Sequence, residues 1–145
     1  KAIEELEQEN KCTGRIAHYD MRFLKPIDEN ILEEVGQNFS EVITVEDGTK
    51  NGGLGTAVME WLNEHNHNIH VQRLALPDEF IEQGTVQQLR QLCGIDKESI
   101  KREIEKRLEA THGEQRYEDN YSRSIRHWNL FGTVSFSQQV RHYTY

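Results

Sequence analysis

Short segments of period-two hydrophobicity alternate with longer segments of helical period along most of this chain. Strands are predicted at residues 15–24, 41–46 and 69–74. Helices are predicted before, between and after these strands, and a second helix follows the last of them. Consecutive parallel strands need helical crossovers, so this order predicts an α/β fold. We expect three layers, α/β/α, around a mostly parallel sheet.

The predicted helices have recognisable caps and apolar faces. Asp28 and Thr85 are placed to cap two of them, and Asp96 to cap the last one. In that last helix Glu103 and Arg107 are spaced to form an ion pair. The apolar positions at helical spacing are Ile31, Leu32 and Val35; Leu54, Val58, Trp61 and Leu62; Val86, Leu89 and Leu92; and Ile100, Ile104 and Leu108.

The first predicted strand, residues 15–24, is apolar on both faces. This pattern predicts an interior strand of a covered sheet, ended by Pro26, which has no N–H to donate to a neighbouring strand. The helix at residues 2–6 has no cap before Lys1, so we expect that it begins upstream.

The composition changes near residue 109. No lysine follows Lys106, four of the five tyrosines lie beyond residue 116, and the acids and bases of residues 109–145 cancel. We therefore predict a domain at residues 1–108 and an appendage at 109–145. Within the appendage, residues 133–140 alternate weakly and predict one strand.

The charge balance excludes two classes of partner. With 25 acidic and 17 basic residues, a net charge of −8 disfavours nucleic acid and anionic membrane surfaces. No apolar run approaches the ~20 residues of a membrane-spanning helix, and the first ten residues do not resemble a secretory signal. Cys12 and Cys93 make no disulfide framework or zinc pattern, which predicts free thiols in a reducing compartment, the cytoplasm.

Three residue patterns are candidates for sites of chemistry. The glycines at 52, 53 and 55 lie between a strand and a helix, as in phosphate cradles, but the spacing fits no phosphate fingerprint and favours tight packing. His65, His67 and His70 suggest a metal, yet their asparagine-rich surroundings favour a polar turn. Neither cysteine has a sequence-level partner for nucleophilic catalysis, so we predict no catalytic, cofactor-binding or metal-binding residue.

Four motifs in one order resemble the C-terminal domain of transketolase-type enzymes, in the form found in the 1-deoxy-D-xylulose-5-phosphate synthase family. They cover roughly residues 1–108. Gln83 stands where the family usually has histidine. The motifs are residues 21–28 (MRFLKPID), residues 45–58 (VEDG and GGLGTAV), residues 76–84 (LPDEFIEQG), and residues 92–96 (LCGID) with Ile100.

The resemblance implies a role in a longer enzyme. That family condenses pyruvate with glyceraldehyde 3-phosphate, using thiamine diphosphate and a divalent metal such as Mg²⁺, and its product feeds isoprenoid and thiamine biosynthesis. The C-terminal domain packs on the preceding domains and helps to form a homodimer. On this resemblance the motif residues are structural or interdomain: Arg22, Lys25, Pro26, Asp28, Glu46, Gly52, Gly53, Gly55, Pro77, Asp78, Phe80 and Gly84.

The family's cofactor-binding run (Gly-Asp-Gly…Asn) and its thiamine-activating glutamate are absent from this sequence. We therefore expect the parent protein to be an enzyme and the isolated chain to be inactive. The family domain also begins with a strand that precedes the first helix, so we expect one strand to be missing and a sheet edge to be open, with residues 133–140 as the candidate cover.

Two alternatives remain. One is a standalone binding or regulatory module, with Arg22 and Lys25 receiving a small anion at a strand end. The other is a metal enzyme that uses the three histidines.

Overall fold

The computed structural model describes residues 1–12, 15–121 and 133–138, with side chains as far as residue 110. Helices and strands alternate as the hydrophobic pattern predicts. In chain order they are α1 (Ala2–Gln8), β1 (Ile16–Asp20), α2 (Glu29–Asn38), β2 (Glu41–Thr49), α3 (Leu54–Glu64), β3 (His70–Leu76), α4 (Val86–Leu92), α5 (Lys97–Tyr121) and β4 (Thr133–Gln138).

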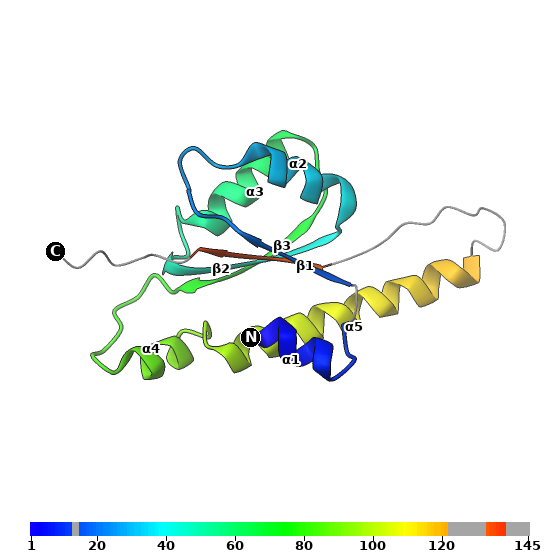
Figure 1. Ribbon diagram of the computed structural model, residues 1–145. Helices are drawn as coiled ribbons and strands as arrows, with labels where there is room; N and C mark the ends of the chain where they lie inside the picture. Colours follow the sequence, from blue (N-terminus) through cyan, green and yellow to red (C-terminus); the bar gives the residue numbers. More distant parts are fainter. Residues whose placement is uncertain (13–14, 122–132, 139–145) are drawn as a thin grey trace.

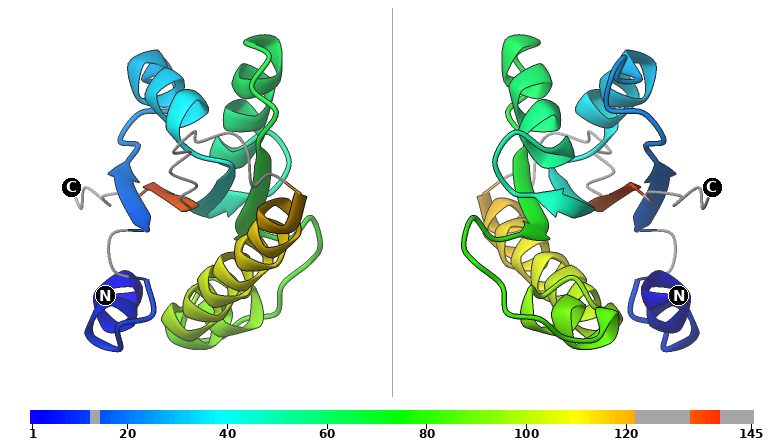
Figure 2. Two further views of the ribbon diagram at one scale, coloured as in Figure 1. Left: turned by 90° about the vertical axis from the view of Figure 1, so that its right-hand side faces the viewer. Right: turned by 90° about the vertical axis from the view of Figure 1, so that its left-hand side faces the viewer.

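The elements form three layers, so the predicted α/β/α architecture is confirmed. Helices α2 and α3 cover one face of the sheet, while α1, α4 and α5 lie on the other side (Figure 1). The end-on views in Figure 2 show the sheet between the two helical layers. In the described part of the chain, no helix has the length and apolar character needed to cross a membrane.

The sheet is parallel throughout, in the order β1-β4-β2-β3. The strand predicted within residues 133–140 is confirmed as β4. Its place differs from the expectation: it fills an interior position between β1 and β2 and covers no edge. The edges are β1 and β3.

The interior position predicted for the first strand is therefore wrong, because β1 lies at an edge. Its two apolar faces have another cause: Ile16 packs against one core, and Ala17 and Tyr19 pack against the other. A strand is buried on both faces when helices cover both sides of the sheet, even if it has only one neighbouring strand. β1 also ends earlier than predicted. Its last pair with β4 is Asp20 with Ser137, so the strand stops at Asp20, well before Pro26.

Each face of the sheet has its own core. β2 supplies both, because alternate side chains of a strand point to opposite faces. Val42 packs under α2 and α3 with Leu32, Leu62 and their neighbours, whereas Ile43 packs over α1 and α5 with Leu6 and Ile104.

The predicted caps form as expected. The Asp28 carboxylate accepts hydrogen bonds from the backbone N–H groups of Asn30 and Ile31. Thr85 and Gln88 make a capping box at α4. In α5 the Arg107 guanidinium donates to Glu103 at 2.9 Å.

Helix α5 runs through the predicted division at residues 108 and 109 without a break. A continuous helix does not by itself separate or join two folding units, so the division stays a prediction.

Candidate functional site at the carboxyl edge of the sheet

Three of the four family-like motifs meet at one edge of the sheet, and the fourth, residues 92–96, joins α4 to α5. In a parallel sheet all carboxyl ends lie on the same side, and ligands of open α/β sheets bind there. Three connections leave this edge: residues 21–28 follow β1, residues 50–53 follow β2, and residues 77–85 follow β3. The fold therefore brings together motifs that are as much as 50 residues apart.

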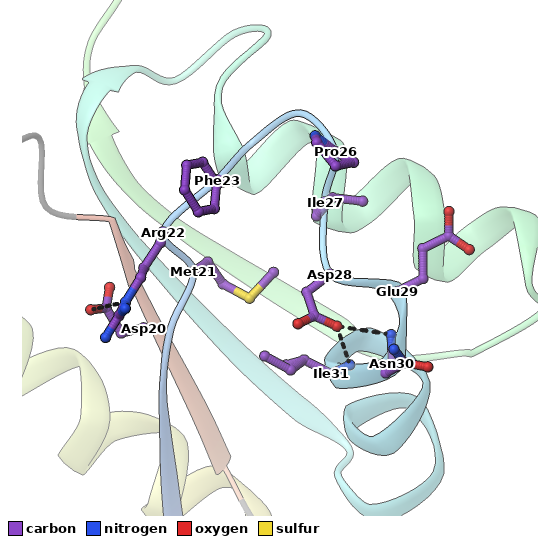
Figure 3. A pocket seen from close by; sticks show the side chains of 10 residues that line it. All are labelled: Asp20, Met21, Arg22, Phe23, Pro26, Ile27, Asp28, Glu29, Asn30 and Ile31. Carbon is purple, nitrogen blue, oxygen red and sulfur yellow. Dashed lines mark hydrogen bonds and ion pairs between the residues drawn. The ribbon is translucent and has the colours of Figure 1, made fainter.

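A pocket of about 670 Å³ opens at the end of β1 (Figure 3). It is bounded by the connection to α2 and by the first turn of that helix. Met21 forms its buried wall, while Phe23 is 69% exposed. The Lys25–Pro26 peptide bond is cis. The lining residues are Asp20, Met21, Arg22, Phe23, Pro26, Ile27, Asp28, Glu29, Asn30 and Ile31.

The charges of this pocket do not favour an anion. Among the described residues that line it, Arg22 is the one cation, and its guanidinium lies 3.8 Å from the Asp20 carboxylate. Two further carboxylates, Asp28 and Glu29, also line the pocket, and Asp28 is engaged as a helix cap. Lys25 is exposed and does not line it. The two cations expected to receive an anion therefore do not converge on this pocket.

The second connection is built around Glu46, whose side chain is buried (3% exposed). Its carboxylate accepts hydrogen bonds from the backbone N–H groups of Leu54 (2.7 Å) and Gly55 (2.9 Å). These groups form the N-terminus of α3, where the helix dipole favours an anion. In this chain a side-chain carboxylate fills the place that a phosphate occupies in nucleotide-binding folds.

The glycines let this carboxylate approach. A Cβ on Gly53 would lie 2.2 Å from Glu46 Oε2, and one on Gly55 would lie 2.6 Å from Thr44 Oγ1. Gly52 adopts φ +77°, in the left-handed region that suits glycine. The cluster therefore serves close packing of strand, turn and helix.

The third connection is the most exposed. Asp78 accepts a hydrogen bond from the Asn51 side chain at 3.4 Å, which links the second and third connections. Pro77 follows the end of β3 directly, and Phe80 is 97% exposed. A Cβ on Gly84 would lie 3.3 Å from Leu89 Cδ2, so this glycine sits against α4.

Helix α4 carries apolar side chains that the described part of the chain leaves exposed. None of its residues is buried, and Val86 (64%) and Leu92 (73%) are exposed. Helical spacing correctly predicts an apolar face here, but spacing does not say which surface covers it. We use the name α4 apolar surface for the three exposed apolar side chains Phe80, Val86 and Leu92, which lie on α4 and on the connection before it. Sequence reasoning identified only Phe80 as a site residue.

The three histidines contact other residues, and His65 and His67 both stack on Trp61. His65 stacks on Trp61 with ring centroids 3.8 Å apart, His67 lies 3.4 Å from Glu33, and His70 lies 2.9 Å from Glu41. Over the described ranges, no cluster of three or more His, Cys, Asp or Glu side chains has a geometry that could hold a metal.

Of the two free cysteines, Cys12 is buried and Cys93 is partly exposed. Burial raises the pKa of the Cys12 thiol above its usual value, so the reactive thiolate is disfavoured. Cys12 packs with Leu6 and Ile104 as a small hydrophobic residue.

Comparison with known proteins gives one family. A family model described as "Transketolase, C-terminal domain" matches residues 1–100. Curated relatives named 1-deoxy-D-xylulose-5-phosphate synthase include that of Bacteroides thetaiotaomicron, 49% identical over 110 residues (75% of this chain, 17% of the relative). That of Phocaeicola vulgatus is 48% identical over 101 residues (69% and 16%). That of Syntrophotalea carbinolica is 45% identical over 85 residues (59% and 13%). The chain thus spans about a sixth of the length of the first two of these relatives.

Proposed function

The chain belongs to the transketolase C-terminal domain family, and on this basis we propose that it acts as the C-terminal structural domain of a 1-deoxy-D-xylulose-5-phosphate synthase. The observation that carries the proposal is the α4 apolar surface. Large apolar side chains that a domain leaves exposed are candidates for burial against another surface. Phe80, Val86 and Leu92 all lie within residues 1–100, which the family model matches, and the curated relatives are several times longer than this chain.

We propose further that other domains of the parent enzyme supply the chemistry. There, thiamine diphosphate and Mg²⁺ would promote the condensation of pyruvate with glyceraldehyde 3-phosphate for isoprenoid and thiamine biosynthesis, in a cytoplasmic homodimer. This chain does not fit the cofactor: the Glu46 carboxylate already takes the backbone donors at α3 that a diphosphate would need.

The motif residues act in this proposal as packing and docking groups. Asp28 begins α2, and Glu46 with its glycines fixes α3 against the sheet. Arg22, Lys25 and Phe23 are exposed beside them and would face the neighbouring domain. Pro77 and Asp78 hold the connection that presents Phe80.

The test combines this chain with the Bacteroides thetaiotaomicron synthase from which the matching C-terminal region has been removed. We expect the chain to bind the truncated synthase and to restore 1-deoxy-D-xylulose 5-phosphate formation. Phe80→Ser should weaken binding about tenfold or more, since exposed aromatic anchors dominate interfaces. Met59→Ser is the matched control, because Met59 is also exposed (41%) but lies on α3. Equal losses in both variants, or no association, would contradict the proposal.

The isolated chain should not consume pyruvate in the presence of thiamine diphosphate and Mg²⁺. Turnover by the chain alone would show that it carries its own chemistry.

The alternative, a standalone binding or regulatory module, is supported by the pocket at the end of β1. A thermal melt distinguishes the two proposals. A rise in Tm with phosphate or pyruvate that Arg22→Ala abolishes would favour the module, whereas an unchanged Tm favours the structural role.

A further inference from the structure

One interior strand of the sheet comes from outside the family match. The match ends at residue 100, whereas β4 begins at Thr133. The matched residues supply β1, β2 and β3 but leave the position between β1 and β2 to β4. The centre of the sheet therefore depends on a separate segment of the chain.

The position that β4 fills has two pairing edges. Ala17 of β1 and Val42 of β2 are both in register with Val134, and the same alignment holds for the neighbouring residues. β1 and β2 do not pair with each other. Without β4, their facing N–H and C=O groups would lose their partners between two helical layers. Such groups are strong donors and acceptors that pair with any strand of suitable register.

A long stretch of chain separates β4 from the other three strands of the sheet. β4 follows the 25-residue helix α5 and is separated from it by residues 122–132. Figure 1 shows the carboxyl end of α5 extending past the amino edge of the sheet. Along its length β4 contacts β1 and β2.

We propose that the position between β1 and β2 is a strand-acceptor site, and that Thr133–Gln138 of a second copy of this chain can enter it in exchange for the chain's own β4. A second copy is the occupant that the register favours, because its segment has the same sequence and reforms every backbone pair. Exchange of an identical element keeps the contacts of the monomer, so it is a low-cost route to a dimer. This inference rests on the strand pairing and is independent of the proposed function.

Single cysteines in two separate full-length chains test the exchange directly. Both chains carry Cys12→Ala and Cys93→Ala; one adds Ala17→Cys and the other adds Val134→Cys. Paired residues on adjacent strands lie about 5 Å apart at Cα, within the range that a disulfide spans. After mixing and mild oxidation we expect a disulfide-linked heterodimer of twice the 17.0 kDa chain mass.

The matched control replaces Ala17→Cys by His18→Cys. His18 is the next residue along β1, so its side chain points to the other face of the sheet. We expect about tenfold less heterodimer from this mixture, because disulfide geometry is strict. A single chain carrying both Ala17→Cys and Val134→Cys should close an internal disulfide, which confirms that the variants fold with β4 in place.

Each remaining outcome overturns the proposal. If the double-cysteine chain closes internally but the mixture gives no heterodimer, β4 does not exchange between copies. Equal yields from the Ala17 and His18 mixtures would mean random collision. If neither mixture nor the double-cysteine chain forms the disulfide, β4 is not the neighbour of β1.

Discussion

At the scale of single residues, Glu46 is the group on which the carboxyl edge depends. Its buried carboxylate accepts hydrogen bonds from the backbone N–H groups of Leu54 and Gly55, the first two residues of α3. A helix N-terminus that would otherwise attract an external anion is thus neutralised from within the chain. The motif that resembles a phosphate cradle becomes a packing device through this one side chain.

Glu46→Gln should destabilise the domain by about 2–3 kcal/mol, because the amide keeps one acceptor and turns an N–H₂ group toward a backbone donor. Urea unfolding of the purified chain measures this. Asp47→Asn is the matched control: Asp47 is exposed and forms an ion pair with Arg90 at 3.2 Å, so its change should stay within about 0.5 kcal/mol. A loss at Glu46 no larger than the loss at Asp47 would contradict the assigned role.

Gly53→Ala should destabilise the domain by about 2–3 kcal/mol, since the added methyl group overlaps Glu46 Oε2 and lies 2.5 Å from the Thr49 backbone oxygen. Gly84→Ala is the control. Its methyl group would lie 3.3 Å from the flexible end of Leu89 and 3.6 Å from the Gln88 side-chain oxygen, so we expect a change below about 1 kcal/mol. Urea unfolding of the two variants compares a methyl group placed against the backbone with one placed against a flexible side chain. Similar unfolding midpoints would contradict close packing as the reason for glycine at position 53.

At the scale of elements, charged contacts join α1 and the turn after it to α5. Lys97 lies 2.8 Å from Glu5, Lys101 lies 2.5 Å from Glu9, and Lys11 lies 2.7 Å from Glu105. They flank the core in which Leu6 meets Ile104. Apolar burial holds the two helices together, and the ion pairs fix their alignment.

These contacts make helix docking sensitive to acid. Hydrogen bonds from Lys101 and then Lys11 lower the pKa of Glu9 from 4.5 to about 2. A lowered folded-state pKa contributes stability that is present above pH 4.5 and is lost as the pH falls toward 2. Lys101→Met should therefore reduce the fall in stability across this pH window. Lys106→Met is the control, because Lys106 is largely exposed and 4.0 Å from Glu103; it should keep the original pH profile, measured by urea unfolding at each pH.

At the scale of the whole molecule, the sheet separates two cores. Leu32 lies in the core under α2 and α3, and Ile104 lies in the core over α1 and α5; both are fully buried. Side chains that share no contacts across a sheet should contribute independently to stability.

Leu32→Ala and Ile104→Ala should each cost about 2–4 kcal/mol, and the double variant should equal their sum within about 0.5 kcal/mol. Denaturant unfolding of the four chains gives the coupling energy. A coupling above about 1 kcal/mol would mean that the two cores act as one. The control pair Leu32→Ala with Val35→Ala lies within one core and should depart from additivity.

Much of this fold follows from local pattern. Caps such as Asp28 and Thr85, the alternation of residues 41–46 and the apolar faces of the helices depend on neighbours within a few residues, so the sequence predicts them. The same locality explains why the four motifs carry the family resemblance.

What local pattern does not contain is which surfaces meet. The apolar face of Val86 and Leu92 resembles a core-facing stripe, and only the tertiary structure shows it uncovered. β1 is hydrophobic on both faces because helices cover both sides of the sheet, and this pattern does not tell an edge strand from an interior one. The interior position of β4 depends on backbone pairing with strands more than 80 residues earlier in the chain. The periodicity of side chains does not show which strands pair. Helices, strands and the family motifs could be predicted from the sequence, because they depend on residues close together in the chain. Strand order, the Glu46 cap and the exposure of α4 depend on contacts between distant segments, which form only when the chain folds.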